Sequence, residues 1–494
     1  MADPLRIALV SSEVTPFAKT GGLADVVAGL GRWLGNQGHD VRIFMPLYGQ
    51  VQSGGFDLHE ARDVGRIRIR FDGSEQEFGA KVCLLPDTAT TPAGKVRVYF
   101  VDSASMFGRD RLYSSTYSDE HIRFGLLCRA AIEFCQRMRF APDVFHCNDW
   151  HTALIPLYLR TLYSWDGLFR RTRTLLTIHN IGYQGQFKPG VIEDLGLGGS
   201  RGLFHQDDLS NKNEVNLLKT GLMYADWLTT VSGTYAQEIQ TQDGGRGLDD
   251  VLRARRDALT GIVNGVDYGD WNPESDRWLT THFSAADLAG KAICKRKLLD
   301  RYNLRQDGDP IVLGIVSRLT AQKGFDLLPD VLPVVLRDER VRLCVLGSGE
   351  ARYEDYFQWL RDQVPERVGI YRGYNEELAH WVEAGADIFL MPSLFEPCGL
   401  NQMYSLRYGT VPVVRRTGGL ADTVVDFDPA TGSGTGFVFD RYESHALLAQ
   451  IQRALATFRE TATWHRLMLN GMAQDWSWDR QGPRYVEIYR RLIG

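Results

Sequence analysis

One hexapeptide occurs twice in this chain, and it constrains the possible fold more than any other feature. The letters TGGLAD stand at residues 20–25 and again at residues 417–422, each time after an apolar stretch typical of a buried strand. Glycines at a strand-to-helix turn allow backbone N–H groups to face an anion at the helix N-terminus. Tight turns alone would explain the glycines, but two turns do not require the same six letters. The repeat therefore predicts two similar units, each with an anion-binding loop.

The elements around the first loop recur in the same order in the second half of the chain. Residues 7–11 are predicted to form a buried strand, followed by the glycine loop, an amphipathic helix and a second strand at 41–45. Residues 311–317 begin this order again, followed by a loop with Lys323 and Gly324, a helix through about residue 336 and a strand at 341–346. A strand, a crossover helix and a parallel strand make a βαβ unit. An α/β domain thus begins twice in the sequence.

The domain boundaries follow from length and from one hinge-like segment. A chain of 494 residues exceeds what one ordinary core supports. The letters GIVNGVD, followed by a Trp-Asn-Pro turn, predict a hinge, so we place domains at residues 1–260 and 261–475. Residues 476–494 have helical spacing, and we expect them to return to the first domain. Ligands bind beyond the carboxyl ends of strands in doubly wound sheets, where both glycine loops are expected.

Composition narrows the partners and the compartment. Apolar residues make up 44% and charged residues 24%, as in ordinary globular proteins. A net charge of -5 without a basic stripe argues against nucleic acid. No apolar run approaches the roughly 20 residues of a membrane helix, and no signal peptide is recognisable. Seven scattered cysteines without a CxxC pair fit a reducing compartment. We expect a cytoplasmic protein with no membrane partner.

Three cations stand at the loops that follow the first predicted strand of each half. Lys19 directly precedes the first loop, where a cation beside backbone donors suits a phosphate, although a solvated surface lysine is the alternative. Arg318 and Lys323 flank the corresponding loop of the second half. Two cations at a strand end can stabilise negative charge on a departing group, whereas the alternative is an ordinary basic turn.

A carboxylate also follows a predicted strand of the second half. Glu396 stands between an aromatic residue and a proline, directly after the apolar residues 388–391. We expect it to be exposed at the strand end, either for chemistry or as a cap of the next helix. Nearby Cys398 is predicted to be a buried, inert thiol rather than a nucleophile.

Polar residues follow two strands of the first half. His179 and Asn180 come after residues 175–178, and Asp149, Trp150 and His151 come after residues 144–146. Such a cluster suits sugar hydroxyls, and the tryptophan suits a sugar face. His146, Asp149 and His151 could instead bind a metal ion, but no convincing remaining ligand is visible, so no metal site is expected.

Several common catalytic signatures are missing from the sequence. It has no GxSxG, Walker A or HExxH motif, and its GSG at residues 347–349 does not continue as GxGxxG. A dinucleotide oxidoreductase is therefore disfavoured.

Taken together, the motifs resemble the family of bacterial glycogen synthases and plant starch synthases. The likeness runs from about residue 5 to residue 490. Its most specific pieces are KTGGL at 19–23, HN at 179–180, NGVD at 264–267, SRL at 317–319, QKG at 322–324, EPCGL at 396–400 and TGGL at 417–420.

The resemblance implies an α/β fold of two Rossmann-like doubly wound domains facing across a cleft, the GT-B type of glycosyltransferase. It implies transfer of glucose from ADP-glucose, or UDP-glucose, to the non-reducing end of an α-1,4-glucan. Retention of configuration and no metal or external cofactor are also implied. The preference for ADP comes from the resemblance alone.

The resemblance also assigns roles to individual residues. Glu396 would orient the glucose hydroxyls, His179 would lie beside the anomeric carbon, and Arg318 and Lys323 would hold the diphosphate. The implied donor-binding residues are Lys19, Gly21, Gly22, Asp25, Cys398, Gly399, Leu400, Thr417, Gly418 and Gly419. The implied acceptor-side residues are Asp149, Trp150, His151 and Asn180.

Two positions depart from the family pattern. Asn401 replaces a threonine of many relatives, and Tyr404 stands where other glycosyltransferase classes carry a second glutamate, so the ribose contact stays unassigned.

A glucan phosphorylase is disfavoured because no pyridoxal-lysine motif is recognisable and the chain is short. A non-catalytic glucan-binding protein could discard Lys19, Arg318, Lys323 or Glu396, yet all are present.

Overall fold

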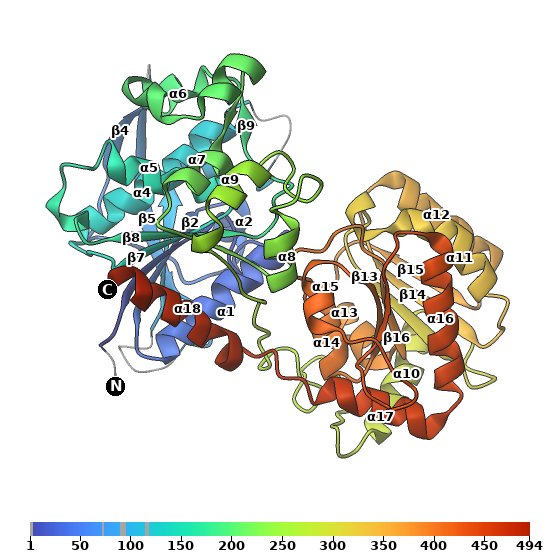
Figure 1. Cartoon of the computed structure of the whole chain (residues 1–494). Coiled ribbons are helices and arrows are strands. Elements are labelled where there is room, and N and C mark those ends of the chain that lie inside the picture. The colour runs from blue at the N-terminus through green and yellow to red at the C-terminus, as the bar shows by residue number, and fades with distance from the viewer. Residues whose placement is uncertain (1–2, 72–73, 89–94, 114–117) are drawn as a thin grey trace. The chain divides into compact units, whose positions relative to one another are not determined.

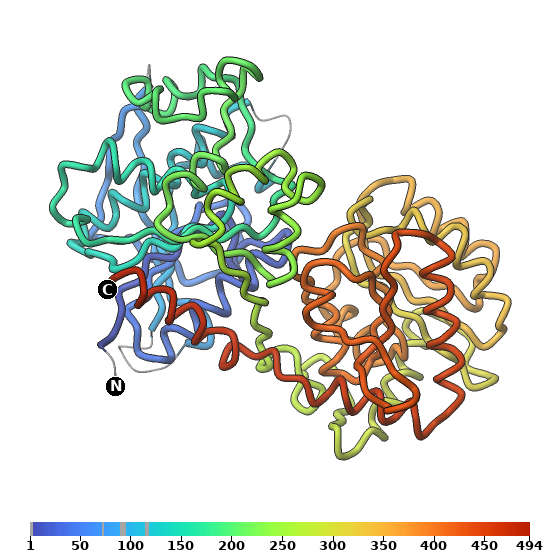
Figure 2. Tube along the Cα trace, viewed as in Figure 1, coloured from blue at the N-terminus to red at the C-terminus, as the bar shows by residue number. Residues whose placement is uncertain are grey.

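The chain folds into two compact units. The computed structural model describes residues 3–71, 74–88, 95–113 and 118–494 (Figure 1). Unit 1 comprises Met1–Val231, Ala236–Gly265 and Trp478–Gly494, and unit 2 comprises Ser232–Tyr235 and Val266–Ser477. Figure 2 traces the chain as it leaves unit 1 after Gly265 and re-enters it at Trp478.

Unit 1 is built on one mixed sheet with the order β12-β11-β8-β7-β1-β2-β6-β5-β3, in which β4 pairs with β5. Its strands are β1 Arg6–Val10, β2 Asp40–Pro46, β3 His59–Glu60, β4 Ile67–Phe71, β5 Ser74–Leu84, β6 Arg97–Asp102, β7 Val144–Asn148, β8 Arg173–Ile178, β11 Trp227–Thr230 and β12 Leu259–Gly261. The strands from β12 to β6 are parallel, whereas β3, β4 and β5 form an antiparallel edge. The parallel part has the 3-2-1-4-5-6 order of a doubly wound sheet, extended by β12.

Unit 2 repeats this order in a wholly parallel sheet, β15-β14-β13-β16-β17-β18. Its strands are β13 Ile311–Val316, β14 Val341–Gly347, β15 Val368–Arg372, β16 Ile388–Met391, β17 Val411–Arg415 and β18 Phe437–Phe439. The strands predicted at 7–11, 41–45, 311–317 and 341–346 are confirmed as β1, β2, β13 and β14.

Helices connect the strands of both units. Those of unit 1 are α1 Gly22–Asn36, α2 Gly49–Ser53, α3 Ala104–Phe107, α4 Glu120–Arg137, α5 Ile155–Arg160, α6 Val191–Asp194, α7 Leu217–Tyr224, α9 Asp249–Ala254 and α18 Trp478–Ile493, and α8 Gly233–Glu238 begins in the segment assigned to unit 2. Those of unit 2 are α10 Ala289–Arg301, α11 Leu328–Val335, α12 Ala351–Gln363, α13 Glu376–Gly385, α14 Asn401–Arg407, α15 Gly418–Thr423, α16 Ser444–Phe458 and α17 Thr461–Met472. A separate two-stranded sheet pairs β9 Gln186–Phe187 with β10 Val215–Asn216.

Both faces of the unit 2 sheet are covered by apolar side chains. Along β13, Ile311, Leu313 and Ile315 belong to one core, while Val312 belongs to the core on the other face. Successive side chains of a strand point to opposite faces, so a strand buried on both sides must be apolar throughout. This explains why the sequence shows an apolar run here rather than an alternating pattern.

The C-terminal helix α18 packs against α1 within unit 1 (Figure 1). A Cβ on Gly29 of α1 would lie 2.1 Å from the indole nitrogen of Trp478, so only glycine allows this close approach. Further along α18, the Tyr489 hydroxyl lies 2.7 Å from Nδ1 of His146 in β7. The last helix is therefore anchored to both the first helix and the sheet.

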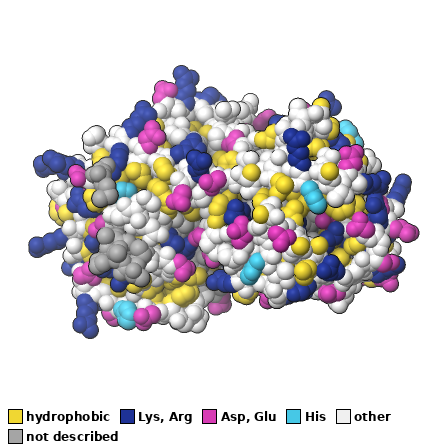
Figure 3. Space-filling view, turned by 90° about the horizontal axis from the view of Figure 1, so that it is seen from below, with side chains coloured by type: hydrophobic (Ala, Val, Ile, Leu, Met, Phe, Trp, Pro, Cys, Tyr) yellow, Lys and Arg dark blue, Asp and Glu magenta, His cyan; other side chains and the backbone are white. Residues whose placement is uncertain are grey.

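No helix in the described part of the chain is long and apolar enough to cross a bilayer. On the face drawn in Figure 3, basic and acidic side chains are interspersed.

Candidate functional site

The predicted site residues lie at the carboxyl ends of the central strands in each unit. In unit 1 they follow β1, β7 and β8, which are neighbours in the sheet. In unit 2 they follow β13, β16 and β17, which are also neighbours. The strand order reverses between the first and fourth strands of each sheet, and this switch point is where doubly wound folds bind ligands.

The first glycine loop holds a carboxylate of the chain itself. The carboxylate of Glu13, just beyond β1, accepts hydrogen bonds from the backbone amide and the hydroxyl of Thr20, the latter at 2.7 Å. The Gly21 amide lies 3.4 Å from the same carboxylate, and the Tyr113 hydroxyl donates to it at 2.7 Å. Two amides expected to face an anionic ligand therefore donate to an internal anion.

Lys19 and Asp25 flank this loop and form an ion pair. The Nζ atom of Lys19 lies 3.0 Å from Oδ1 of Asp25, and both side chains are partly exposed. Asp25 also accepts a hydrogen bond of 2.9 Å from the Thr15 hydroxyl. The structure thus brings two of the predicted donor-side residues together at the start of α1.

Asp149 connects the ends of β7 and β8. Its backbone has a positive φ of 55°, and its carboxylate accepts hydrogen bonds from the amides of His179 at 2.7 Å and Asn180 at 3.4 Å. Burial raises the pKa of Asp149 to about 7. Asn180 uses its own side-chain oxygen to accept from the Gly182 amide at 2.9 Å. Predicted residues from two strand ends are therefore joined in one network.

His179 is neutral and its tautomer is fixed by Asn148. Burial lowers the pKa of His179 to about 3. The Asn148 amide group donates to the Val10 carbonyl at 3.0 Å, so its oxygen faces Nε2 of His179 at 2.8 Å. Nε2 consequently carries the proton and Nδ1 carries a lone pair.

Trp150 and His151 are buried in an aromatic cluster. The His151 ring centre lies 4.2 Å from that of Trp150 and 4.5 Å from that of Phe124. A Cβ on Gly185 would lie 2.4 Å from the Trp150 indole. Gly185 therefore covers part of the Trp150 ring. Burial lowers the pKa of His151 to about 3. The expectation that Trp150 presents an open face to a sugar does not fit this packing.

His146 does not point toward the other candidate metal ligands. Its Nδ1 contacts Tyr489, and its Nε2 lies 2.6 Å from the Thr177 hydroxyl. Within residues 3–71, 74–88, 95–113 and 118–494, no three His, Cys, Asp or Glu side chains are arranged to hold a metal ion.

An ion pair forms the centre of the unit 2 site. Nζ of Lys323 lies 2.7 Å from Oε2 of Glu396, and the hydroxyl of Ser393 donates to the same oxygen at 3.0 Å. Glu396 is only 4% exposed, so the expectation of an exposed carboxylate is wrong. The helix-cap alternative is also wrong, because α14 begins at Asn401 without a side-chain cap.

The glycines of the second loop allow two backbones to touch. A Cβ on Gly418, which has a φ of 43°, would lie 1.9 Å from the Glu396 carbonyl oxygen. A Cβ on Gly419 would lie 2.1 Å from the Cys398 carbonyl oxygen. The amide of Gly419 donates to the Glu396 carbonyl at 3.1 Å. The EPCGL and TGGL segments are therefore packed backbone to backbone, which buries Glu396.

The residues after Glu396 fix this arrangement. The side-chain amide of Gln402 donates to the carbonyls of Cys398 at 3.1 Å and Gly399 at 3.0 Å. Asn401, one of the departures from the family pattern, donates to the Val316 carbonyl at the end of β13 at 2.9 Å. Thr417 and Cys398 are buried, and Leu400 is half-buried at the start of α14. All seven cysteines are buried thiols.

Arg318 differs from the other unit 2 residues. It is exposed, and its guanidinium makes no hydrogen bond or ion pair with any residue that the structure describes, although its carbonyl accepts from the Ser317 hydroxyl at 3.0 Å. Tyr404, the second departure, is buried, and its ring stacks on Trp271 with centres 3.9 Å apart. Tyr404 is thus part of an aromatic stack that continues from Trp271 to His380 at 3.7 Å.

Comparison with known proteins places this geometry in a family. The starch synthase catalytic domain matches residues 6–254, and the glycosyl transferases group 1 domain matches residues 297–463. A glycogen synthase of Geotalea uraniireducens is 44% identical over 492 residues, which cover 99% of each chain. The chain belongs to the glycogen and starch synthase family. A glycogen synthase of Koribacter versatilis is 45% identical over 99% of this chain and 98% of its own.

Solved structures show the same fold for this synthase family member. The catalytic domain of starch synthase IV from Arabidopsis thaliana, bound to ADP and acarbose, has a TM-score of 0.90 and 32% identity, covering 99% of this chain and all of that chain. A sucrose-phosphate synthase from Thermosynechococcus elongatus, 18% identical, shares the fold with a TM-score of 0.61 over 99% of this chain and 98% of its own. The prediction of two Rossmann-like domains of the GT-B type is confirmed.

Four residues of the synthase site were missed by sequence reasoning. Glu13 and Asn148 lie at strand ends, where the same reasoning singled out Glu396 and Asp149. That signal could have found them. Ser393 follows β16 and carries the same signal. Tyr113 does not, because its contact with Glu13 depends on tertiary packing.

Proposed function

We propose that this member of the synthase family transfers glucose from ADP-glucose to the non-reducing end of an α-1,4-glucan, with retention of configuration, in glycogen biosynthesis. The observation that carries the proposal is the Lys323–Glu396 ion pair at the switch point of unit 2. The starch synthase IV catalytic domain from Arabidopsis thaliana has the same fold, and its structure was solved with ADP bound. Full-length similarity to glycogen synthases supports the glucan acceptor. We also place the protein in the cytoplasm.

Unit 2 is proposed to handle the departing nucleoside diphosphate. Breaking the bond to glucose builds negative charge on the outer phosphate, and fixed cations stabilise such charge. Arg318 is exposed and has no ion-pair partner among the described residues, so its guanidinium is available for an anion. The Lys323 ammonium is held in place by its hydrogen bond to Glu396, and we propose that it contacts the phosphate.

Glu396 is proposed to orient the transferred glucose. Both hydrogen bonds of its carboxylate fall on Oε2. Its Oε1 atom has no hydrogen-bond partner among the described side chains and amides, and so it can accept from a sugar hydroxyl.

Unit 1 is proposed to contribute the neutral His179. Its protonated Nε2 is held by Asn148, which leaves the Nδ1 lone pair to accept from a hydroxyl of the sugar. As the bond to the diphosphate breaks, the anomeric carbon of the sugar gains positive charge. A neutral imidazole places no further positive charge beside it. Asp149 holds the backbone of this residue and of Asn180 in place.

The experiment compares kcat/KM for ADP-glucose and UDP-glucose with glycogen as acceptor, measured by release of nucleoside diphosphate. ADP-glucose should be used at least tenfold more efficiently. A higher kcat/KM for UDP-glucose would overturn the donor assignment, and no glucan-dependent release from either donor would overturn the function.

A further inference from the structure

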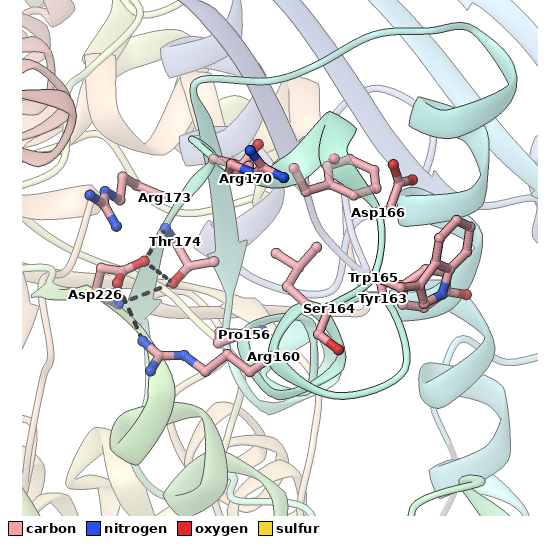
Figure 4. A pocket seen from close by; sticks show the side chains of 14 residues that line it. Pro156, Arg160, Tyr163, Ser164, Trp165, Asp166, Arg170, Arg173, Thr174 and Asp226 are labelled. Carbon is pink, nitrogen blue, oxygen red and sulfur yellow. Dashed lines mark hydrogen bonds and ion pairs between the residues drawn. The ribbon is translucent and has the colours of Figure 1, made fainter.

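A pocket opens on unit 1 at the opposite end of the sheet from the site residues. Its volume is about 360 Å³, and Arg173 and Thr174, the first residues of β8, lie in its wall (Figure 4). His179 follows the last residue of the same strand. A strand of six residues spans about 20 Å, so this pocket is separate from the site described above.

The segment that leads into β8 supplies two guanidiniums that have no carboxylate partner. Arg170 and Arg173 both line the pocket, and both are exposed. The Arg170 guanidinium makes no hydrogen bond or ion pair with any residue in the described part of the chain. Arg173 donates from Nε to the Leu492 carbonyl at 3.1 Å, and its two terminal nitrogens have no partner among the described residues. Both positive charges are therefore available to a ligand.

The two carboxylates of the pocket are already engaged by the chain itself. Asp226 accepts from the amide and the hydroxyl of Thr174, each at 2.8 Å, and pairs with Arg160 at 3.3 Å (Figure 4). Asp166 accepts from a backbone amide at 2.8 Å and from the Gln136 side chain at 2.6 Å. Because these contacts hold both carboxylates, they do not compensate the two unpaired guanidiniums.

An exposed tryptophan with a fixed ring forms another side of the pocket. Trp165 is 75% exposed, and its indole N–H donates to the Leu162 carbonyl at 2.9 Å, which fixes the orientation of the ring. In Figure 4 the indole and Arg173 lie on opposite sides of the pocket. A fixed aromatic face open to water suits stacking against a flat ring or the C–H face of a sugar. The pocket thus combines a stacking surface with two cations.

We propose that this pocket binds a small phosphate monoester, with its phosphate held by Arg170 and Arg173 and its ring stacked on Trp165. A phosphate monoester carries a charge of roughly -1.5 to -2 at neutral pH, which two guanidiniums match. Guanidinium groups bind phosphate oxygens through paired N–H donors, which adds geometric specificity to the charge attraction. Sugar phosphates and nucleoside monophosphates share this chemistry.

Isothermal titration calorimetry of the full chain, with ADP at saturation to fill the proposed donor site, tests the proposal. The probes are inorganic phosphate, glucose 6-phosphate and AMP, with glucose and adenosine as neutral counterparts. At least one monoester should bind about tenfold or more tightly than its neutral counterpart, and the tighter of the two identifies the source of the ligand. Its affinity should fall as the salt concentration rises, because the attraction is between charges.

Three variants and a matched control locate the binding. Arg170→Gln and Arg173→Gln should each weaken the monoester about tenfold. Trp165→Ala should weaken the monoester and leave the affinity for inorganic phosphate unchanged. Arg171→Gln is the control, because Arg171 is exposed in the same segment and does not line the pocket. It should keep the wild-type affinity for every probe.

Several outcomes would overturn the site. One is the absence of binding by all three phosphate probes at millimolar concentration, and another is equal affinity for each monoester and its neutral counterpart. An equal loss in the Arg171 variant would show general attraction to a basic surface. Wild-type affinity in Arg170→Gln would also contradict the proposal, and this variant should melt normally, because its guanidinium has no contact to lose among the described residues.

Discussion

At the residue scale, Glu396 shows how burial decides which substitution is informative. Alanine would remove the partner of Lys323, whose side chain is 19% exposed and keeps part of its hydration. We expect a loss of about 2 kcal/mol in the free energy of unfolding, between the values for exposed and buried pairs.

Glu396→Gln keeps the volume and a hydrogen-bond acceptor, so it tests chemistry with little change in packing. We expect kcat to fall roughly 10²- to 10³-fold while the melting temperature changes by only a few degrees. Steady-state kinetics and a thermal melt of the same preparation check this. A normal kcat would show that the carboxylate only anchors Lys323.

His151 makes a prediction for acid stability. Burial lowers its pKa from 6.5 to about 3, so the unfolded chain takes up a proton between these values and the folded chain does not. The stability that depends on the neutral ring is complete above pH 6.5 and is lost as the pH falls toward 3. In His151→Phe, the free energy of unfolding should depend less steeply on pH, by about 1 kcal/mol per unit between pH 5 and 6.

Denaturant titrations at several pH values measure this slope. Phenylalanine suits the aromatic surroundings of the ring, and Nδ1 of His151 has no hydrogen-bond partner among the described residues. An unchanged slope would mean that the ring is protonated in the folded protein.

At the scale of elements, the two identical hexapeptides have different surroundings. A Cβ on Gly21 would meet nothing within 4 Å, whereas a Cβ on the equivalent Gly418 would lie 1.9 Å from the Glu396 carbonyl oxygen. Gly21→Ala should therefore change the free energy of unfolding by less than about 0.5 kcal/mol. Gly418→Ala should cost about 1–3 kcal/mol, because backbone atoms must move. Equal effects in urea titrations would contradict the observed packing.

This contrast shows what the sequence can predict. The repeat and the apolar runs predicted both βαβ units, and strand ends located Lys19, Lys323 and Glu396, because these are local patterns. The burial of Glu396 could not be read locally, since it depends on the distant backbone of Gly418 and Gly419. The antiparallel edge β3–β5 and the closed packing around Trp150 likewise depend on long-range contacts.

At the scale of the whole molecule, unit 1 is completed by the last segment of the chain. The Trp478 indole packs against Gly29, and Tyr489 reaches His146. A chain ending at Ser477 should lose stability in unit 1 by about 3 kcal/mol or more, because it loses a buried tryptophan and tyrosine. Hydrogen exchange should rise in peptides of α1 and β7, while peptides of β13 to β16 keep their protection. Uniform changes in both units would contradict the assignment of α18 to unit 1.

The central claim is that this chain extends an α-1,4-glucan at its non-reducing end by using Lys323 to stabilise the departing diphosphate. The direct measurement uses ADP-glucose that is labelled in the sugar. Incorporation of the label into glycogen is measured, and the glycogen is then digested with an exo-acting α-1,4-glucosidase. Label should enter the polymer and be released at the start of digestion, and Lys323→Ala should incorporate it roughly 10²- to 10³-fold more slowly. Absence of incorporation, late release of the label, or a wild-type rate in the lysine variant would contradict the account.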